Sequence, residues 1–287
     1  MANETTMRFS VAVLLALVLW TPDTAASPEG VVFSLGSSGA VLVPVGINGH
    51  GPFMFVLDTG SSHSTVSQKL TVGLALPAVA KTSVMTMAGA QTQLVVQVRQ
   101  VVIGDATSDN LTPSVVSTAQ LSAIEPGIDG ILGQDFLSRF DYTVDYRRNR
   151  LRWTAENCDD KRSRLPLIRQ ADRFVVRLPG NRRDAPVLMV PDSGSEGFII
   201  FERNGWTPVV VDYTTELVAV VVLAGRQVGR RAVLRELQVG AVTLRNQRAV
   251  VVTREGSSAV EGDGLMPLHR FSSVSFNNSE GYLVVRR

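Results

Sequence analysis

The stretch that decides the fold is Phe53-Met-Phe-Val-Leu-Asp-Thr-Gly-Ser-Ser62, in which five apolar residues run directly into an aspartate followed by small polar residues. A short apolar run with bulky and β-branched side chains predicts a buried strand, and Gly60 ends it. An aspartate at the mouth of such a strand is costly to ionise unless hydroxyls or backbone N–H groups donate to it. Asp58 is therefore either a functional carboxylate or the start of an ordinary Asx turn. A second copy of the motif would favour the functional interpretation.

That second copy is present in the other half of the chain. Val187-Leu-Met-Val-Pro-Asp-Ser-Gly-Ser195 again leads from apolar residues into an aspartate, a hydroxyl residue and a glycine. Two more motifs recur, Met87-Ala-Gly-Ala-Gln91 as Leu223-Ala-Gly-Arg-Gln227 and Asp129-Gly-Ile-Leu132 as Asp263-Gly-Leu-Met266. The copies are separated by 134 residues for the aspartates, by 136 for the second motif and by 134 for the third. This nearly fixed register indicates an internal duplication.

The pattern between these motifs is typical of an all-β protein. Short apolar runs alternate with Gly, Ser and Asn turns, and helical periodicity is scarce. Strands are expected at 31–33, 41–47, 53–57, 101–103, 114–116, 142–146 and 151–153, a hairpin at 83–98, a polar loop at 105–112 and a short helix at 134–140. The charged segment from Glu156 is the linker candidate. We therefore expect two homologous β-barrel lobes, at 28–155 and 162–287, joined by a linker at 156–161.

The first residues have the pattern of a secretory signal. Met7-Arg8 supplies positive charge, Val11 to Leu19 form an apolar core, and Thr24-Ala-Ala-Ser27 offers a small-residue cleavage site. The core is about half of the roughly 20 residues that a membrane span needs. We expect a signal peptide at 1–26, cleavage after Ala26, no stable membrane span afterwards, and a periplasmic or secreted protein. A retained anchor is the weaker alternative.

Composition and residue inventory exclude several other functions. The 28 basic and 26 acidic residues give a formal charge of +2, which is too small an excess to indicate a nucleic-acid partner. The single cysteine, Cys158, stands among acidic residues that would raise its pKa, which argues against a nucleophile. Three histidines and no Gly-x-Ser-x-Gly motif argue against a nucleophilic hydrolase. His63 is interpreted as a turn residue, because no second His or Cys lies at ligand spacing. We expect neither metal nor cofactor.

Two duplicated aspartates suggest a specific chemistry. Lobes related by a pseudo-twofold axis place equivalent residues opposite each other, so Asp58 and Asp192 could meet across a cleft. Two carboxylates about 3 Å apart cannot both ionise cheaply and would share one proton. The ionised group could then deprotonate a water while the protonated group polarises an amide carbonyl. Gly-bearing hairpins could close over the substrate and exclude solvent.

These residues resemble the retropepsin-like and pepsin-like aspartic proteases. The resemblance rests on the two Asp-hydroxyl-Gly-Ser motifs, the two hairpins and Asp129-Gly-Ile-Leu-Gly133. It covers nearly all of the chain after the signal, and the two lobes look like a fused pair of retropepsin protomers with symmetric hairpins. It implies an aspartic endopeptidase with a peptide or protein substrate, working as a monomer that contains its own pseudo-dimer. It implies catalytic roles for Asp58 and Asp192.

The same resemblance implies roles for neighbouring residues. Thr59 and Ser193 would link the lobes through hydrogen bonds, and Ser61 and Ser195 would support the carboxylates beside the turn glycines Gly60 and Gly194. Flap residues would be Met87, Ala88, Gly89, Leu223, Ala224 and Gly225.

The second copy departs from the family pattern at three positions. Pro191 cannot donate a ladder hydrogen bond, so the strand should bulge or lie at an edge there. Glu196 replaces Ser62 and would raise the proton affinity of the pair if it pointed inward. Pro267 replaces the equivalent of Gly133. These changes leave open a rival hypothesis, a catalytically impaired peptide-binding module of the same fold.

Overall fold

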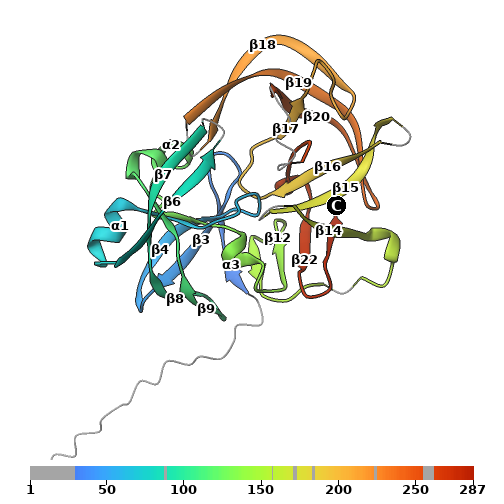
Figure 1. Ribbon diagram of the computed structural model, residues 1–287. Coiled ribbons are helices and arrows are strands. Elements are labelled where there is room, and N and C mark those ends of the chain that lie inside the picture. Colours follow the sequence, from blue (N-terminus) through green and yellow to red (C-terminus); the bar gives the residue numbers. More distant parts are fainter. Residues whose placement is uncertain are drawn as a thin grey trace, which may run out of the picture.

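The computed structural model describes residues 30–86, 89–156, 158–170, 173–182, 185–222, 225–254 and 262–287. The fold is all-β, with strongly curved sheets in both halves of the chain (Figure 1). The expected signal peptide at 1–26 lies outside the described residues. In the described part of the chain, no helix is long and apolar enough to cross a membrane.

The first half folds around a ten-stranded sheet. Its strands are β2 (Ser34–Leu35), β3 (Val41–Ile47), β4 (His50–Leu57), β5 (Thr65–Ser67), β6 (Ala78–Thr86), β7 (Gly89–Val96), β8 (Val98–Ile103), β9 (Ala106–Leu111), β10 (Ser114–Val116) and β11 (Gly130–Leu132). Three short helices accompany them, α1 (Gln68–Gly73), α2 (Thr118–Ile124) and α3 (Gln134–Leu137). The alternating Val and Ile residues of β3 are all buried, as a strand with one face on the core requires.

The remaining strands form one path of thirteen. They are β1 (Val31–Val32), β12 (Tyr142–Asp145), β13 (Arg150–Arg152), β14 (Arg164–Gln170), β15 (Arg173–Arg182), β16 (Ala185–Asp192), β17 (Phe198–Glu202), β18 (Val211–Val222), β19 (Gly225–Val239), β20 (Val242–Thr253), β21 (Gly264–Pro267), β22 (Ser273–Asn277) and β23 (Tyr282–Arg286). Two 3₁₀ turns, η1 (Lys161–Ser163) and η2 (Leu268–Arg270), complete this part.

The duplication is visible in the strand pairing around each aspartate. In the first lobe, β4 lies between antiparallel β3 and parallel β11. In the second, β16 lies between antiparallel β15 and parallel β21. Each aspartate motif therefore begins where a fully flanked interior strand ends, and the two lobes share one topology. This confirms the expected fold class of two homologous lobes.

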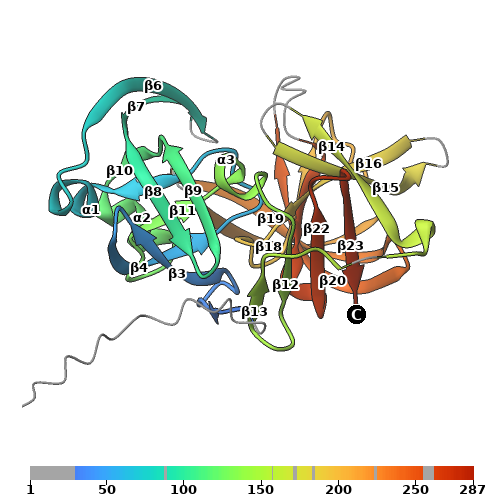
Figure 2. The ribbon, with the colours of Figure 1, turned by 90° about the horizontal axis from the view of Figure 1, so that it is seen from below.

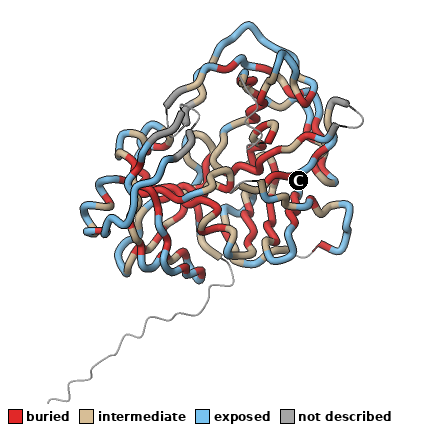
Figure 3. Tube along the Cα trace, in the orientation of Figure 1, coloured by how far each residue is buried: buried red, intermediate tan, exposed pale blue. Residues whose placement is uncertain are grey.

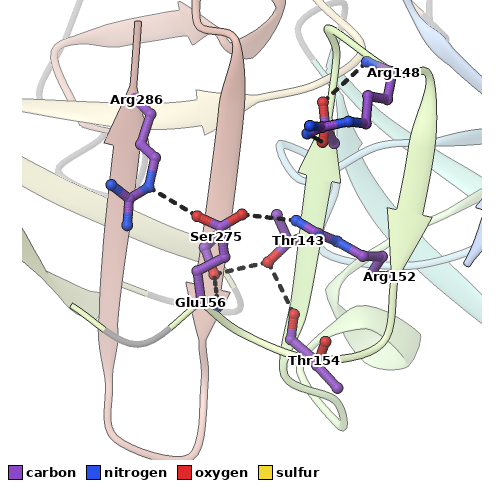
Figure 4. Close-up of polar contacts among 8 residues, drawn as sticks. Thr143, Arg148, Arg152, Thr154, Glu156, Ser275 and Arg286 are labelled. Carbon is purple, nitrogen blue, oxygen red and sulfur yellow. Dashed lines mark hydrogen bonds and ion pairs between the residues drawn. The ribbon is translucent and has the colours of Figure 1, made fainter. Parts of the chain in front are cut away.

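The two halves also share a sheet at their junction. β12 pairs with β22, and Thr143 lies opposite Ser275 with their hydroxyl oxygens 2.9 Å apart (Figures 2 and 4). Next to this pair, the Glu156 carboxylate accepts hydrogen bonds from Arg152 at 2.7 Å and from Arg286 at 2.8 Å. These two arginines are 134 positions apart, the same separation as the aspartates. The lobe and linker boundaries given above stay a prediction, and the shared sheet crosses them.

Buried side chains are continuous between the lobes. The main cluster draws on strands of both halves, and buried stretches concentrate at the centre of the molecule (Figure 3). Where β12 meets β22, the rings of Tyr142 and Phe276 stack with centroids 4.7 Å apart. Trp153 packs against Tyr142 at 6.0 Å and donates a hydrogen bond to the carbonyl of Ile103. The lobes are thus joined by apolar packing as well as by strand pairing.

Three local predictions differ from the structure. The expected polar loop at 105–112 contains a strand, β9, whose inward positions include the small polar Ser108 rather than a bulky apolar residue. Two helices were not expected, because α1 and α2 have only six and seven residues, too few for a periodic signal. The expected helix at 134–140 ends at Leu137.

Candidate active site

The structure brings the two predicted aspartates together at the lobe junction. Asp58 is half-buried and follows β4 directly, and Asp192 is buried at the last position of β16. Their carboxyl groups lie side by side, because a single point, the position of a Cβ atom added to Gly194, is 3.3 Å from Oδ1 of both aspartates. A Cβ atom on Gly60 would lie 2.7 Å from Cγ of Asp192, and one on Gly194 would lie 3.2 Å from Cγ of Asp58. Each glycine therefore leaves room for the carboxylate of the opposite lobe.

Four hydrogen bonds made by Thr59 and Ser193 to groups of the opposite lobe, which we call the interlobe grip, hold the two loops together. The Thr59 hydroxyl donates to the Pro191 carbonyl at 2.7 Å and accepts from the Ser193 N–H at 3.0 Å. The Ser193 hydroxyl donates to the Leu57 carbonyl at 2.6 Å and accepts from the Thr59 N–H at 3.0 Å. Both side chains are buried, so each hydroxyl satisfies two backbone groups that water does not reach. The predicted linking role of these two residues agrees with this geometry.

Backbone N–H groups hold each carboxylate from its own loop. Asp58 Oδ1 accepts from Gly60 at 2.9 Å and from Ser61 at 3.1 Å, and Asp192 Oδ1 accepts from Gly194 at 2.8 Å. The hydroxyls of Ser61 and Ser195 were expected to support the carboxylates, but they donate to other groups. The Ser61 hydroxyl donates to the His63 carbonyl, and the Ser195 hydroxyl donates to the Gly197 carbonyl. These hydroxyls stabilise the turns, and Ser61 supports its carboxylate through its backbone.

The surroundings of Asp58 and Asp192 raise the pKa of both carboxyls above that of an ordinary aspartate. Burial raises the pKa of Asp58. Burial, followed by the charge of Asp58, raises the pKa of Asp192 well above its usual range of about 3.8. Hydrogen bonds from Gly60 and Gly194 and the positive charge of Arg173 act in the opposite direction. One of the two neighbouring carboxyls resists ionisation, so the pair holds one proton. The protonated carboxyl can act as an acid and the ionised one as a base.

Arg173 is a member of the site that sequence analysis missed. It is half-buried at the first position of β15, the strand that runs antiparallel to the Asp192-bearing strand β16. Its charge lowers the pKa of both aspartates. The available signal was a basic residue at the start of the strand preceding the second aspartate motif, a position that gains meaning only once the pairing of β15 with β16 is known.

Two of the three departures in the second lobe are accommodated by the fold. Although β16 is an interior strand, at Pro191 it is paired on one side only, as the expected local edge requires. Pro191 pairs with Met266 in β21, while the pairing with β15 runs only as far as Met189, so the proline takes no place in that ladder. Glu196 is exposed, and its charge is not among the influences on the pKa of Asp192.

The third departure concerns a tight position of the first lobe, where a Cβ on Gly133 would lie 2.7 Å from the backbone of His63. The positions 134 residues later are Pro267 and Gly197. A Cβ on Gly197 would lie 3.5 Å from the Arg248 carbonyl oxygen, an ordinary contact distance, and nothing in the structure explains the proline at 267.

The two predicted hairpins are present but unequal. In the first, Thr86 pairs with Gly89, and in the second Val222 pairs with Gly225. The remaining flap candidates Met87, Ala88, Leu223 and Ala224 lie outside the described residues. The strands of the first hairpin have nine and eight residues and those of the second twelve and fifteen, which corrects the expectation of symmetric hairpins. The longer hairpin arches over the molecule, and β18 contacts α2 of the first lobe (Figure 1).

His63 takes part in a turn. Its side chain is exposed, with Nδ1 3.0 Å from the Ser62 hydroxyl. Among the described residues, no group of three or more His, Cys, Asp or Glu side chains could hold a metal ion. Cys158 is buried, and its thiol donates to the Asp160 carbonyl.

Comparison with known proteins gives a family match within the first lobe. Residues 43–136 match the family model described as aspartyl protease. Among solved structures, the chain is similar to a retropepsin-like aspartic protease from Rickettsia conorii, with 18% identity over 38% of this chain and 78% of that chain and a TM-score of 0.29. No curated protein matches the chain. The matched region includes Asp58, the first hairpin and Ile131-Leu-Gly133. The role of Asp192 rests on the duplication and on the geometry above.

Proposed function

We propose that this chain belongs to the retropepsin-like aspartic protease family and is an endopeptidase that hydrolyses peptide bonds with a water activated between Asp58 and Asp192. The observation that carries the proposal is the closeness of the two carboxyls at the lobe junction, where each accepts at least one N–H donor from its own loop. The interlobe grip fixes their separation. Family membership alone would not establish activity, because a duplicated lobe can keep its shape and lose its chemistry.

The proton arrangement defines the reaction. One carboxylate takes a proton from the water, whose oxygen forms a bond to the carbonyl carbon of the substrate. The protonated partner donates to the carbonyl oxygen, giving a neutral tetrahedral intermediate. The carbon–nitrogen bond then breaks as the amine nitrogen takes a proton from the protonated aspartate and a hydroxyl proton of the intermediate returns to the ionised one. The products are an amine and a carboxylic acid, and the pair again holds one proton. No covalent bond to the protein forms.

The substrate is proposed to be a peptide in extended conformation. The two hairpins offer strand edges beside the dyad, and an extended peptide can add to such edges through main-chain hydrogen bonds. Closure of hairpins over a substrate excludes water and strengthens the electrostatic interactions inside. We further propose that one chain suffices, since both aspartates come from it, and that the protein acts after export.

Cleavage assays test this function. Purified protein is incubated with a diverse peptide library from acidic to neutral pH, together with Asp58→Asn and, as a surface control, Asp109→Asn, whose side chain is exposed. We expect cleavage by the wild type and the control, and a loss of at least about 10³-fold in Asp58→Asn, because general acid–base groups contribute about 10²–10⁴-fold each. Cleavage that survives in Asp58→Asn would refute the proposal.

A binding experiment distinguishes the rival hypothesis, a peptide-binding module without catalytic activity. A statine-type peptide mimics the tetrahedral intermediate, so it should bind an active dyad tightly. Tight binding of ordinary peptides, no preference for the statine analogue and no cleavage at any pH would instead identify a binding module.

A further inference from the structure

A cavity of about 620 Å³ opens beside the second aspartate loop. Its walls come from that loop (Gly194–Gly197), from β18 of the long hairpin (Val218–Val220), from β20 (Arg248–Val250) and from α2 of the first lobe (Ala123 and Ile124). We call it the basic pocket. Because its wall begins two residues after Asp192, the pocket lies within reach of a peptide held at the dyad, and residues of both lobes line it.

The charges that line the basic pocket are mostly positive. Among the described residues, Arg231, Arg248 and Arg270 line it together with one carboxylate, the exposed Glu196. Arg231 is partly neutralised by an ion pair with Glu216 at 3.1 Å, in which both side chains are about half exposed. The net charge of the described lining therefore favours an anion, and solvent screens the exposed Glu196 and the exposed Arg248 alike.

Two of these arginines have donor capacity to spare. Within the described part of the chain, the exposed Arg248 side chain makes no hydrogen bond or ion pair. Arg270 donates one hydrogen bond to the Glu196 carbonyl at 3.4 Å, while its Nε is buried and has no partner among the described residues. A buried donor without a partner destabilises the protein. A ligand group that accepts hydrogen bonds could therefore pair with arginine N–H donors that have no acceptor within the protein.

We propose that the basic pocket is a specificity subsite that binds an acidic side chain, Asp or Glu, of the peptide substrate. The inference rests on the proposed function. Guanidinium groups bind carboxylates through short charge-assisted hydrogen bonds and present several donors in a planar fork. The apolar part of the wall, Val218, Val220 and Ile124, suits the methylene groups of such a side chain. Endopeptidase cleavage by this protein would then favour sites with an acidic residue at one fixed distance from the scissile bond.

Binding of non-hydrolysable peptides tests the inference without relying on turnover. A statine-containing peptide with an amidated C-terminus is made in versions that carry a single Glu, or Gln as its neutral isostere, at each of four positions on either side of the statine. The amide separates binding of a side chain from binding of a terminal carboxylate, which a further peptide with a free C-terminus measures. Kd values are determined by calorimetry or fluorescence anisotropy for the wild type, Arg248→Gln and the control Arg245→Gln. Arg245 lies on the same strand and is exposed and paired with Glu236.

We expect the Glu peptide to bind about 10-fold more tightly than the Gln peptide at one position only, a ratio that one partly solvated charge-assisted contact of about 1.4 kcal/mol supplies. Arg248→Gln should bring this ratio close to one, and Arg245→Gln should leave it unchanged. Added salt should reduce the ratio in the wild type.

The possible failures are distinguishable. If the wild type binds Glu and Gln peptides equally at every position, the acidic subsite is wrong, while the proposed hydrolytic function stands. A preference that survives in Arg248→Gln, or one seen only for the free C-terminus, would also overturn the assignment. A protein that binds no statine peptide at all would overturn the proposed function and this inference with it.

Discussion

Removal of one hydroxyl from the interlobe grip should destabilise the whole molecule. Thr59→Val keeps the shape of the side chain but deletes the donor to the Pro191 carbonyl and the acceptor of the Ser193 N–H. Thr59 is 1% exposed, so water cannot replace the hydroxyl. Each buried backbone group left without a partner costs about 1–3 kcal/mol. The expected loss in the free energy of unfolding is therefore about 2–6 kcal/mol.

The chain contains a matched control for this change. Thr65 is 5% exposed, and its hydroxyl has no hydrogen-bond partner among the described residues. Thr65→Val is also a hydroxyl-to-methyl exchange in a buried position, but it leaves no backbone group unsatisfied. We expect it to be neutral or slightly stabilising, because it removes a buried polar atom that has no partner.

Urea unfolding followed by tryptophan fluorescence measures both variants. The midpoint should fall strongly for Thr59→Val and stay the same or rise for Thr65→Val, with similar dependence on denaturant. Equal small effects of the two substitutions would show that the four hydrogen bonds of the grip do not hold the lobes together.

Three further outcomes follow from the site and the shared sheet. The folded-state pKa of Asp192 is raised above 3.8, so the native protein keeps a proton that the unfolded chain releases. The contribution of this proton to the free energy of unfolding is fully present below about pH 4 and is lost as pH rises through the folded pKa, with a slope approaching about 1.4 kcal/mol per pH unit. Thermal unfolding measured across this pH range should show the slope in the wild type and not in Asp192→Asn. Arg173→Gln removes a charge that lowers the pKa of both aspartates, so the acidic limb of the cleavage pH profile should move to higher pH, and a profile that stays in place would exclude its influence. Glu156→Gln weakens the ion pairs to Arg152 and Arg286, whose partly exposed geometry makes them worth about 0–1 kcal/mol each; urea unfolding should show a loss of about 1 kcal/mol, and no loss should occur in the surface variant Glu236→Gln.

The strands that carry the aspartates could be predicted from sequence because their signal is local. The run from Phe53 to Leu57 is continuously apolar, and it becomes an interior strand with neighbours on both sides. The 134-residue repeat then predicted the second lobe and the meeting of Asp58 with Asp192. Symmetry supplies the long-range contact that a single sequence otherwise lacks.

Features that depend on non-local pairing could not be obtained in this way. The shared sheet joins β12 to β22 across most of the second half of the chain, and the apolar alternation of these strands does not indicate their partner. The role of Arg173 follows from the pairing of β15 with β16, and the basic pocket combines residues of both lobes. The strand β9 was missed because Ser and Thr positions hide its alternation.

Carbon-13 NMR titration of the aspartate carboxyl groups tests most directly whether the two lobes build one proton-sharing pair. Signals of Asp58 and Asp192 are assigned by their disappearance in the two Asp→Asn variants. We expect Asp192 in the wild type to titrate well above the ordinary aspartate range, and its pKa to fall in Asp58→Asn, because the charge of Asp58 is one of the causes of the raised value. Two carboxyls that titrate independently near 3.8, each unaffected by loss of the other, would contradict the pairing on which the hydrolytic function depends.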